Sequence, residues 1–269
     1  MKKNQTQKVI DEAIEQLAAA LANGQSDAMK KYLLAMAKFS AYSIGNILLI
    51  LAQRPQATRI AGYRTWQELG RNVKKGEKGI LITAPVVLRK KRGDRRSRAP
   101  PADKEEDMIL HFKAVHVFDI SQTDGKPLPE PARVGGNPNG QTEKLKAFVA
   151  SKGIALDYSS SLGTADGQSQ GRKITIREGL QPAEEFSVLV HEVAHSLLHF
   201  GDLATSKTVR ETEAEAVAFV VCQAIGLESG TSSSDYIQLY RGDKETLAQS
   251  LERIQRTASA ILDAITTKT

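Results

Sequence analysis

Apolar residues in the first part of the chain recur at helical spacing. A single stripe predicts an amphipathic helix over residues 8–22, built on Val9, Ala13, Leu17 and Leu21. A second run predicts helix from residue 28 to residue 52, with a bend near Ser43 or Gly45. Arg54-Pro55 ends it, because proline cannot continue a helix.

From residue 57 the pattern changes to short strands and turns. We expect a strand over 57–63, one helical turn over 65–70, and two paired strands over 80–88 and 108–120. The connection between these two strands begins with a strongly basic run at 89–98 and continues with Ala99-Pro100-Pro101. Its length and composition predict a mobile loop.

A segment rich in proline and glycine separates the two halves of the sequence. Lys126–Pro131 and Gly135–Gly140 resemble an interdomain linker. The sequence therefore predicts an α+β protein with two domains, at residues 1–126 and 142–269, joined by a linker at 127–141. The second domain is expected to contain, in order, a helix at 142–151, strands at 154–158 and 173–177, a helix from 182 towards 200, a helix at 208–225, a polar irregular stretch at 232–241 and a closing helix at 243–265.

The helix that begins at Pro182 carries the sequence His191-Glu192-Val193-Ala194-His195. On a helix the two histidines lie one turn apart on one face, with Glu192 beside them. Two imidazoles in this arrangement bind zinc, and the carboxylate between them serves as the base for a water molecule that the metal activates. The pattern predicts a zinc metallopeptidase with Glu192 as its catalytic residue and a Zn²⁺ cofactor.

A catalytic zinc usually has a third protein ligand, and several residues compete for this role. His199 lies roughly 12 Å along the helix from His191, too far to share a metal, and is better placed as a cation near the helix C-terminus. Glu211 and Glu215 share one face of the next helix, whereas Glu213 points away from Glu211. We predict Glu211 as the ligand and Glu215 as the acceptor of a histidine N–H.

Three alternatives to this assignment stay open at the level of sequence. Glu215, Glu213 or Asp202 are the other possible ligands. In addition, Thr208 and Glu211 have the spacing of a capping box, which would turn Glu211 back to the backbone. The strand at 173–177 is expected to be an edge strand, against which an extended peptide substrate pairs.

Charge is divided unevenly between the two halves. Residues 1–100 hold 20 Lys or Arg against 7 Asp or Glu, a balance of +13, whereas the rest of the chain is acidic. Basic side chains interleaved with aromatic ones favour single-stranded DNA as partner, although each aromatic taken alone is more often a core residue. The candidate DNA-binding residues are Arg54, Tyr63, Arg64, Trp66, Arg71, Lys74, Lys75 and Lys78.

Composition mainly indicates where in the cell the protein is expected. With one cysteine, no signal peptide and no apolar run long enough to cross a bilayer, the sequence predicts a cytoplasmic protein without membrane contact.

Several short motifs resemble the N-terminal domain of ArdC-type antirestriction proteins. They are Tyr42-Ser43 with Asn46, Gln53-Arg54-Pro55, Gly62–Trp66, Leu69-Gly70-Arg71, Lys75–Ile80 and Val117–Thr123. The histidine pair with Glu211 and Glu215 is similar to the zincin-like peptidase domain of the same family, and to the IrrE and ImmA peptidases. The resemblance implies an α+β single-stranded-DNA-binding domain followed by a metallopeptidase domain, with Glu211 as third ligand. Those relatives have Asn or Asp at the position of Glu215.

The family resemblance implies protection of incoming mobile-element DNA, as on plasmids, by a protein that binds single strands non-specifically. We also consider a DNA-coating protein with a structural, non-proteolytic zinc domain, and a DNA-activated protease that cleaves a repressor or a DNA-bound protein. The protein substrate, if there is one, cannot be named from the sequence.

Overall fold

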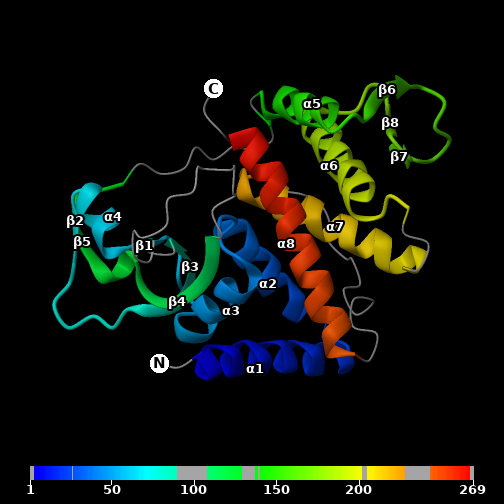
Figure 1. Ribbon diagram of the computed structural model, residues 1–269. Helices are drawn as coiled ribbons and strands as arrows, with labels where there is room; N and C mark the ends of the chain where they lie inside the picture. Colours follow the sequence, from blue (N-terminus) through cyan, green and yellow to red (C-terminus); the bar gives the residue numbers. More distant parts are fainter. Residues whose placement is uncertain are drawn as a thin grey trace, which may run out of the picture.

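The computed structural model describes residues 3–25, 27–89, 108–128, 137–138, 140–201, 205–227 and 243–266 (Figure 1). The elements of the first half are α1 (Lys3–Ala22), α2 (Asp27–Lys38), α3 (Ile44–Gln53), β1 (Ile60–Gly62), α4 (Tyr63–Glu68), β2 (Arg71–Val73), β3 (Ile80–Arg89), β4 (Met108–Asp119), the 3-10 helix η1 (Ile120–Gln122) and β5 (Thr123–Gly125). Those of the second half are α5 (Gln141–Ser151), β6 (Ala155–Ser159), β7 (Gly167–Gln170), β8 (Lys173–Arg177), α6 (Pro182–Leu198), α7 (Lys207–Ala224) and α8 (Lys244–Thr266).

The predicted bend in the second helix is a complete break. α2 ends at Lys38 and α3 begins at Ile44, because Ser43 takes an extended conformation and its side chain accepts a hydrogen bond from the Asn46 N–H. A serine in this position caps a new helix start. The prediction of one bent helix was therefore wrong, while the end of α3 at Gln53, just before Arg54-Pro55, agrees with the sequence.

β1, β4 and β3 form an antiparallel sheet in that order, which confirms the predicted pairing of the two long strands. Ile80 faces Val117 across the ladder, and Ile82 faces Val115. These side chains belong to the face of the sheet that packs into the hydrophobic core. The predicted strand at 57–63 is shorter than expected and covers only Ile60–Gly62.

Two side-chain amides of α3 cover the edge of β3. Asn46 bonds to both the N–H and the carbonyl of Thr83, and Gln53 does the same with Leu81. The two residues lie about two turns apart on the helix and therefore meet alternate residues of the strand. This arrangement satisfies backbone groups of an edge strand that would otherwise be open to another chain.

In the second half, β6, β8 and β7 form a sheet in that order, with β8 parallel to β6 and antiparallel to β7. The prediction that residues 173–177 form an edge strand is wrong, because β8 has partners on both sides. The edge strands are β6 and β7, and the sequence analysis missed β7. Its sequence, Gly-Gln-Ser-Gln, lacks the alternating apolar residues that mark a strand.

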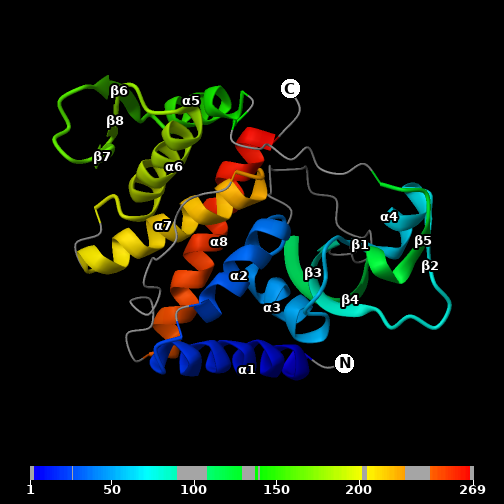
Figure 2. The same ribbon diagram turned by 180° about the vertical axis from the view of Figure 1, so that it is seen from behind.

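The helices of both halves pack into one layered body (Figures 1 and 2). α2 packs on α7 and α1 on α8, and a single hydrophobic cluster contains residues from both halves. Gln255 on α8 donates to the carbonyls of Ser40 and Tyr42, between α2 and α3. Only part of the 127–141 segment is described, so the domain boundary there stays a prediction.

The remaining expectations fall into two groups. The helices expected at 8–22, 142–151, 208–225 and 243–265 are present with ends shifted by a few residues. The basic run at 90–98 and the stretch at 232–241 lie outside the described residues. Among the helices that are described, none combines the length and the apolar character needed to cross a membrane.

The amide ladder leads to a prediction about stability. Asn46→Ala removes the three hydrogen bonds between Asn46 and Thr83 and leaves a half-buried backbone N–H without its acceptor, so we expect it to lower the free energy of unfolding by about 1–3 kcal/mol. Chemical denaturation measures this loss. Gln16→Ala, which replaces an exposed amide on α1, is the control and is expected to stay within about 0.5 kcal/mol of the parent protein. Equal effects of the two substitutions would argue against the ladder.

Candidate metal centre

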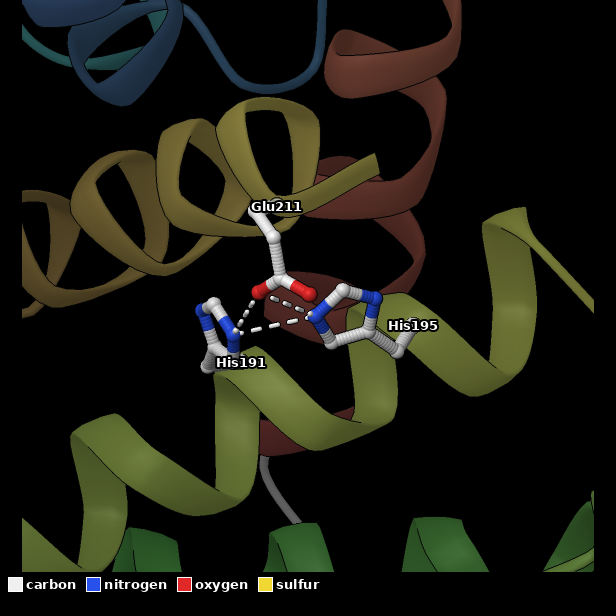
Figure 3. A group of neighbouring side chains, drawn as sticks. All are labelled: His191, His195 and Glu211. Carbon is white, nitrogen blue, oxygen red and sulfur yellow. Dashed lines mark hydrogen bonds and ion pairs between the residues drawn. The ribbon is translucent and has the colours of Figure 1, made fainter. Parts of the chain in front are cut away.

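The helix that carries the two histidines begins and ends with clear local signals. Pro182 occupies the first turn of α6, and Gln181 and Glu184 form a reciprocal capping box there. Leu189 and Val193 are fully buried on the side that meets the core. His191 and His195 consequently lie on a side of α6 that faces α7 (Figure 3).

Three side chains from these two helices converge on one point (Figure 3). The Nε2 atoms of His191 and His195 are 3.0 Å apart, and Glu211 Oε2 lies 3.5 Å from the first and 3.2 Å from the second. All the donor atoms of this group lie within 4.8 Å of one another. The structure thus brings together the three residues that the sequence predicted as ligands.

The spacing of these atoms fits a metal ion. Donors bound at about 2.0–2.1 Å in tetrahedral directions are separated from one another by roughly 3.3 Å. The observed separations of 3.0–3.5 Å bracket this value. Two neutral nitrogens and one carboxylate form a donor set that suits a divalent first-row cation and leaves a fourth position for water.

Glu211 does not take the rival capping role. α7 begins at Lys207, and its N-cap is Ser206, whose side chain accepts from the Val209 N–H. Thr208 is already helical, and its carbonyl accepts a hydrogen bond from the Thr212 hydroxyl. Because the helix starts two residues earlier than the capping-box spacing requires, the side chain of Glu211 is left to reach α6.

Glu215 lies one turn beyond Glu211 and meets the other nitrogen of His191. Its Oε2 is 3.4 Å from His191 Nδ1. Burial disfavours the charged form of His191, but hydrogen bonds with Glu211 and Glu215 outweigh this effect and raise its pKa to about 9. Hydrogen bonds with His191 and His195 in turn lower the pKa of Glu211. The carboxylates of Glu211 and Glu215 therefore both stabilise positive charge where the three side chains converge. A bound cation would supply this charge.

His199, which the sequence excluded, and Glu213, one of the alternative ligands, lie behind the centre. Glu213 is completely buried on the far side of α7, where it accepts hydrogen bonds from Ser250 and Arg253 of α8. His199 is the C-cap of α6 and lies 3.6 Å from the Glu213 carboxylate. These contacts connect α6, α7 and α8 beneath the three converging side chains. Asp202, the remaining alternative ligand, lies outside the described residues.

Glu192 lies against β7. Its exposed fraction is 7%, and a Cβ atom added at Gly167 would lie 2.8 Å from both its Cγ and its Oε1. Gly167 does not have a positive φ, so space, not backbone conformation, requires glycine there. Burial raises the pKa of Glu192, and the positive charge of the two histidines opposes this shift. Sequence reasoning missed Gly167 because it missed β7.

A cleft of about 650 Å³ opens beside the three residues. β7 forms one wall through Gly167, Gln168 and Ser169, and the start of α7 forms another. The hydroxyl of Ser169 bonds to that of Ser196 at 2.8 Å, which fixes the edge strand to α6. The cleft therefore joins Glu192, the three converging side chains and an edge strand in one accessible space.

The candidate DNA-binding residues fall into different environments. Trp66 is 1% exposed, and its indole N–H donates to the Phe118 carbonyl. A buried indole offers no face to a base, so this part of the prediction was wrong and the core interpretation holds. Arg71 bonds to Thr123, Gly125 and Lys126, which assigns it a structural role between β2 and β5.

The other candidates are accessible to different degrees. Arg54 and Lys74 are held near the Ser121 turn by hydrogen bonds to that residue. Tyr63 is 50% exposed. The exposed cations are Arg64, Lys74, Lys75 and Lys78.

Comparisons with known proteins agree with this architecture. Residues 3–118 match the family model described as the N-terminal domain of anti-restriction factor ArdC. The chain is 27% identical over 278 residues to the uncharacterized protein pXO2-81 of Bacillus anthracis, in an alignment covering 87% of the chain. The alignment covers 47% of that protein, so the chain spans about half the length of this relative.

Two crystal structures of the antirestriction ArdC protein from the R388 plasmid share the fold. The metal-free form is 20% identical, with a TM-score of 0.53, over 95% of this chain and 97% of that one. The Mn(II)-bound form is 19% identical, with a TM-score of 0.52, over 97% and 99%. Residues 3–118 therefore match the N-terminal domain of ArdC proteins, and the chain as a whole shares the α+β fold of these two ArdC structures.

Proposed function

We propose that this protein is an antirestriction factor that binds single-stranded DNA without sequence specificity and carries a zinc-dependent peptidase centre. The observation that carries the peptidase part is the convergence of His191, His195 and Glu211 beside the carboxylate of Glu192 in one open cleft. A purely structural zinc site is usually closed by four protein ligands. Three ligands, an adjacent base and access to substrate favour hydrolysis.

The roles of the individual residues follow from their positions. A bound zinc ion supplies Lewis acidity towards a carbonyl and a water molecule. Glu192 is the general base, and its burial against Gly167 holds a raised pKa that suits proton acceptance. Glu215 accepts from His191 Nδ1 and so keeps Nε2 available as the ligand atom.

β7 is the natural place for an extended peptide. In the described part of the chain it pairs on one side only, with β8, and its residues line the cleft. A peptide added along the other side would extend the sheet and lie across the centre. Pairing with a peptide substrate, which the sequence assigned to the strand at 173–177, is therefore proposed for β7.

Metal identity and DNA binding are supported less directly. The ArdC protein from the R388 plasmid has been crystallised with Mn(II), which supports a divalent cation as the cofactor, and the two-histidine, one-carboxylate donor set favours zinc. The charge of +13 over residues 1–100 and the exposed cations around Tyr63 support binding to DNA phosphates. Binding of this kind would bring the peptidase centre to incoming DNA.

The first test removes the base without removing a ligand. Glu192→Gln is expected to retain a full equivalent of zinc, measured by metal analysis, while hydrolysis of a peptide library falls to background. Glu178→Gln, an exposed carboxylate outside the cleft, is the matched control and should leave both readouts unchanged. Metal-dependent cleavage that survives Glu192→Gln would exclude this mechanism.

The same variant separates the proposed function from its alternatives. If the centre acts by proteolysis, Glu192→Gln should lose protection of transferred DNA in a restriction assay. Undiminished protection would instead favour a DNA-coating protein with a structural metal. Cleavage that occurs only when single-stranded DNA is added would favour the DNA-activated protease.

A second test separates the ligand from its neighbour. Loss of a residue that only orients a ligating histidine typically weakens metal binding by about 10–100-fold, and we expect this range for Glu215→Gln. Glu211→Gln removes the negative charge of a ligand and replaces one of its two carboxylate oxygens by an amide nitrogen, so it is expected to weaken zinc binding more than Glu215→Gln does. Competition with a fluorescent chelator measures both constants. The reverse order would exchange the two roles.

A third test uses a substitution in β7 to displace the proposed base, Glu192. Gly167→Ala places a methyl group against Glu192, and a misplacement of about 1 Å is enough to lower turnover by about 100-fold. Zinc affinity should change little, because Gly167 does not touch the three ligands. Gly163→Ala, in the loop before β7, strains a backbone with a φ of +62° but brings its methyl group within 4 Å of no other atom, so it shows what backbone strain alone does to turnover. Turnover equal to that of the parent protein would show that Gly167 does not position Glu192.

A further inference from the structure

β4 carries a row of ring side chains on the face turned away from the hydrophobic core. Side chains alternate between the two faces of a strand, and Val115 and Val117 belong to the core face. Phe112, His116 and Phe118 therefore share the opposite face. Phe112 is 61% exposed, His116 is exposed and Phe118 is half-buried.

Tyr63 extends this row at one end. Its ring meets that of Phe118 edge to face, with centroids 6.4 Å apart, and half of its surface remains exposed. Trp66, on the same helix, fixes α4 to β4 through its bond to the Phe118 carbonyl. The buried tryptophan thus anchors the position of the exposed tyrosine. We call Tyr63, Phe118, His116 and Phe112 the aromatic row.

Gly79 shows that the middle of the row is closely packed against the backbone. A Cβ atom there would lie 2.8 Å from His116 Cβ and 3.1 Å from Phe118 Cζ. The φ of Gly79 is not positive, so the rings, not the backbone conformation, exclude a side chain. His116 and Phe118 lie side by side over this residue.

Exposed cations are adjacent in sequence to Tyr63 and to Gly79. Arg64 follows Tyr63, and Lys78 precedes Gly79, with Lys75 in the same turn. The acidic residue of that turn, Glu77, is engaged by a hydrogen bond from Gln122 and lies 4.0 Å from Arg54. The surroundings of the row are therefore positively charged, in a half of the chain with a large excess of basic residues.

We propose that the aromatic row is the platform on which bases of single-stranded DNA stack. This inference rests on the proposed DNA binding and assigns the surface responsible for it. Alternate residues on a strand are separated by roughly 6.6–6.8 Å, so each ring of the pair at 116 and 118 has room for its own base. Cations beside aromatic faces suit a single strand, because a duplex hides the faces of its bases.

The test compares a normal oligonucleotide with one that has a backbone but no bases. Stacking on a ring is expected to contribute about 5- to 150-fold per base, so Phe112→Ala and His116→Ala should each weaken binding of oligo(dT) by this factor. Neither should change the affinity for an abasic oligonucleotide of equal length. Both measurements use fluorescence anisotropy on the full-length protein, with thermal melting to show that the variants are folded.

Two controls make the comparison specific. Phe200→Ala removes a ring with 60% exposure beside the metal cleft and should leave both affinities unchanged. Lys78→Ala should weaken binding to both oligonucleotides and reduce the salt dependence of the binding constant, as expected for a phosphate contact. Photocrosslinking of iodinated oligonucleotides should label Tyr63, Phe112 or His116.

The outcomes separate this inference from the function on which it rests. If the parent protein does not bind single strands, the proposed DNA binding is wrong, and the role proposed for the aromatic row is wrong as well. If it binds but Phe112→Ala and His116→Ala have no effect, or affect the abasic strand equally, DNA binding stands and this surface is excluded. Crosslinks confined to other parts of the chain would exclude it as well.

Discussion

The metal centre depends on the way α6 and α7 face each other. Two histidines one turn apart define a point in space, but a third donor at the right distance requires the second helix to pass over that point. Glu211 reaches it because α7 begins at Lys207 under the control of Ser206. The separations of 3.0–3.5 Å between the donor atoms are a consequence of this packing. Everything that we propose for Glu192 and the cleft follows from it.

The packing of α7 is in turn secured from behind. Glu213 is buried and accepts from Ser250 and Arg253, so a carboxylate that plays no part in the metal centre holds α7 against α8. α8 also bonds to the segment between α2 and α3 through Gln255. The buried carboxylate is tolerated because Ser250 and Arg253 both donate hydrogen bonds to its Oε1. The helices of both sequence halves thereby contribute to one frame around the cleft.

The motifs that connect this chain with the ArdC family mostly serve the fold. Asn46 and Gln53 cover the edge of β3, Trp66 joins α4 to β4, and Asp119 accepts hydrogen bonds from the backbone of residues 58 and 59. Other residue types cannot make the same contacts. Polar and aromatic residues of this kind therefore form motifs that can be recognised in a sequence. The exposed rings on β4 cannot be identified from the sequence, because alternation alone does not say which face of a strand is covered.

Local chemistry is what the sequence by itself determined: the start of α6 at Pro182, the end of α3, the two long strands, and the placement of His191, Glu192 and His195 around one helical turn. These features depend on residues close together in the chain, where propensity and spacing act directly. Only the tertiary structure decided that Glu211 meets His191 and His195, that Trp66 is buried, and that β7 and not β8 forms the edge beside Glu192. Each of these depends on contacts between segments distant in sequence, for which no local pattern carries the information.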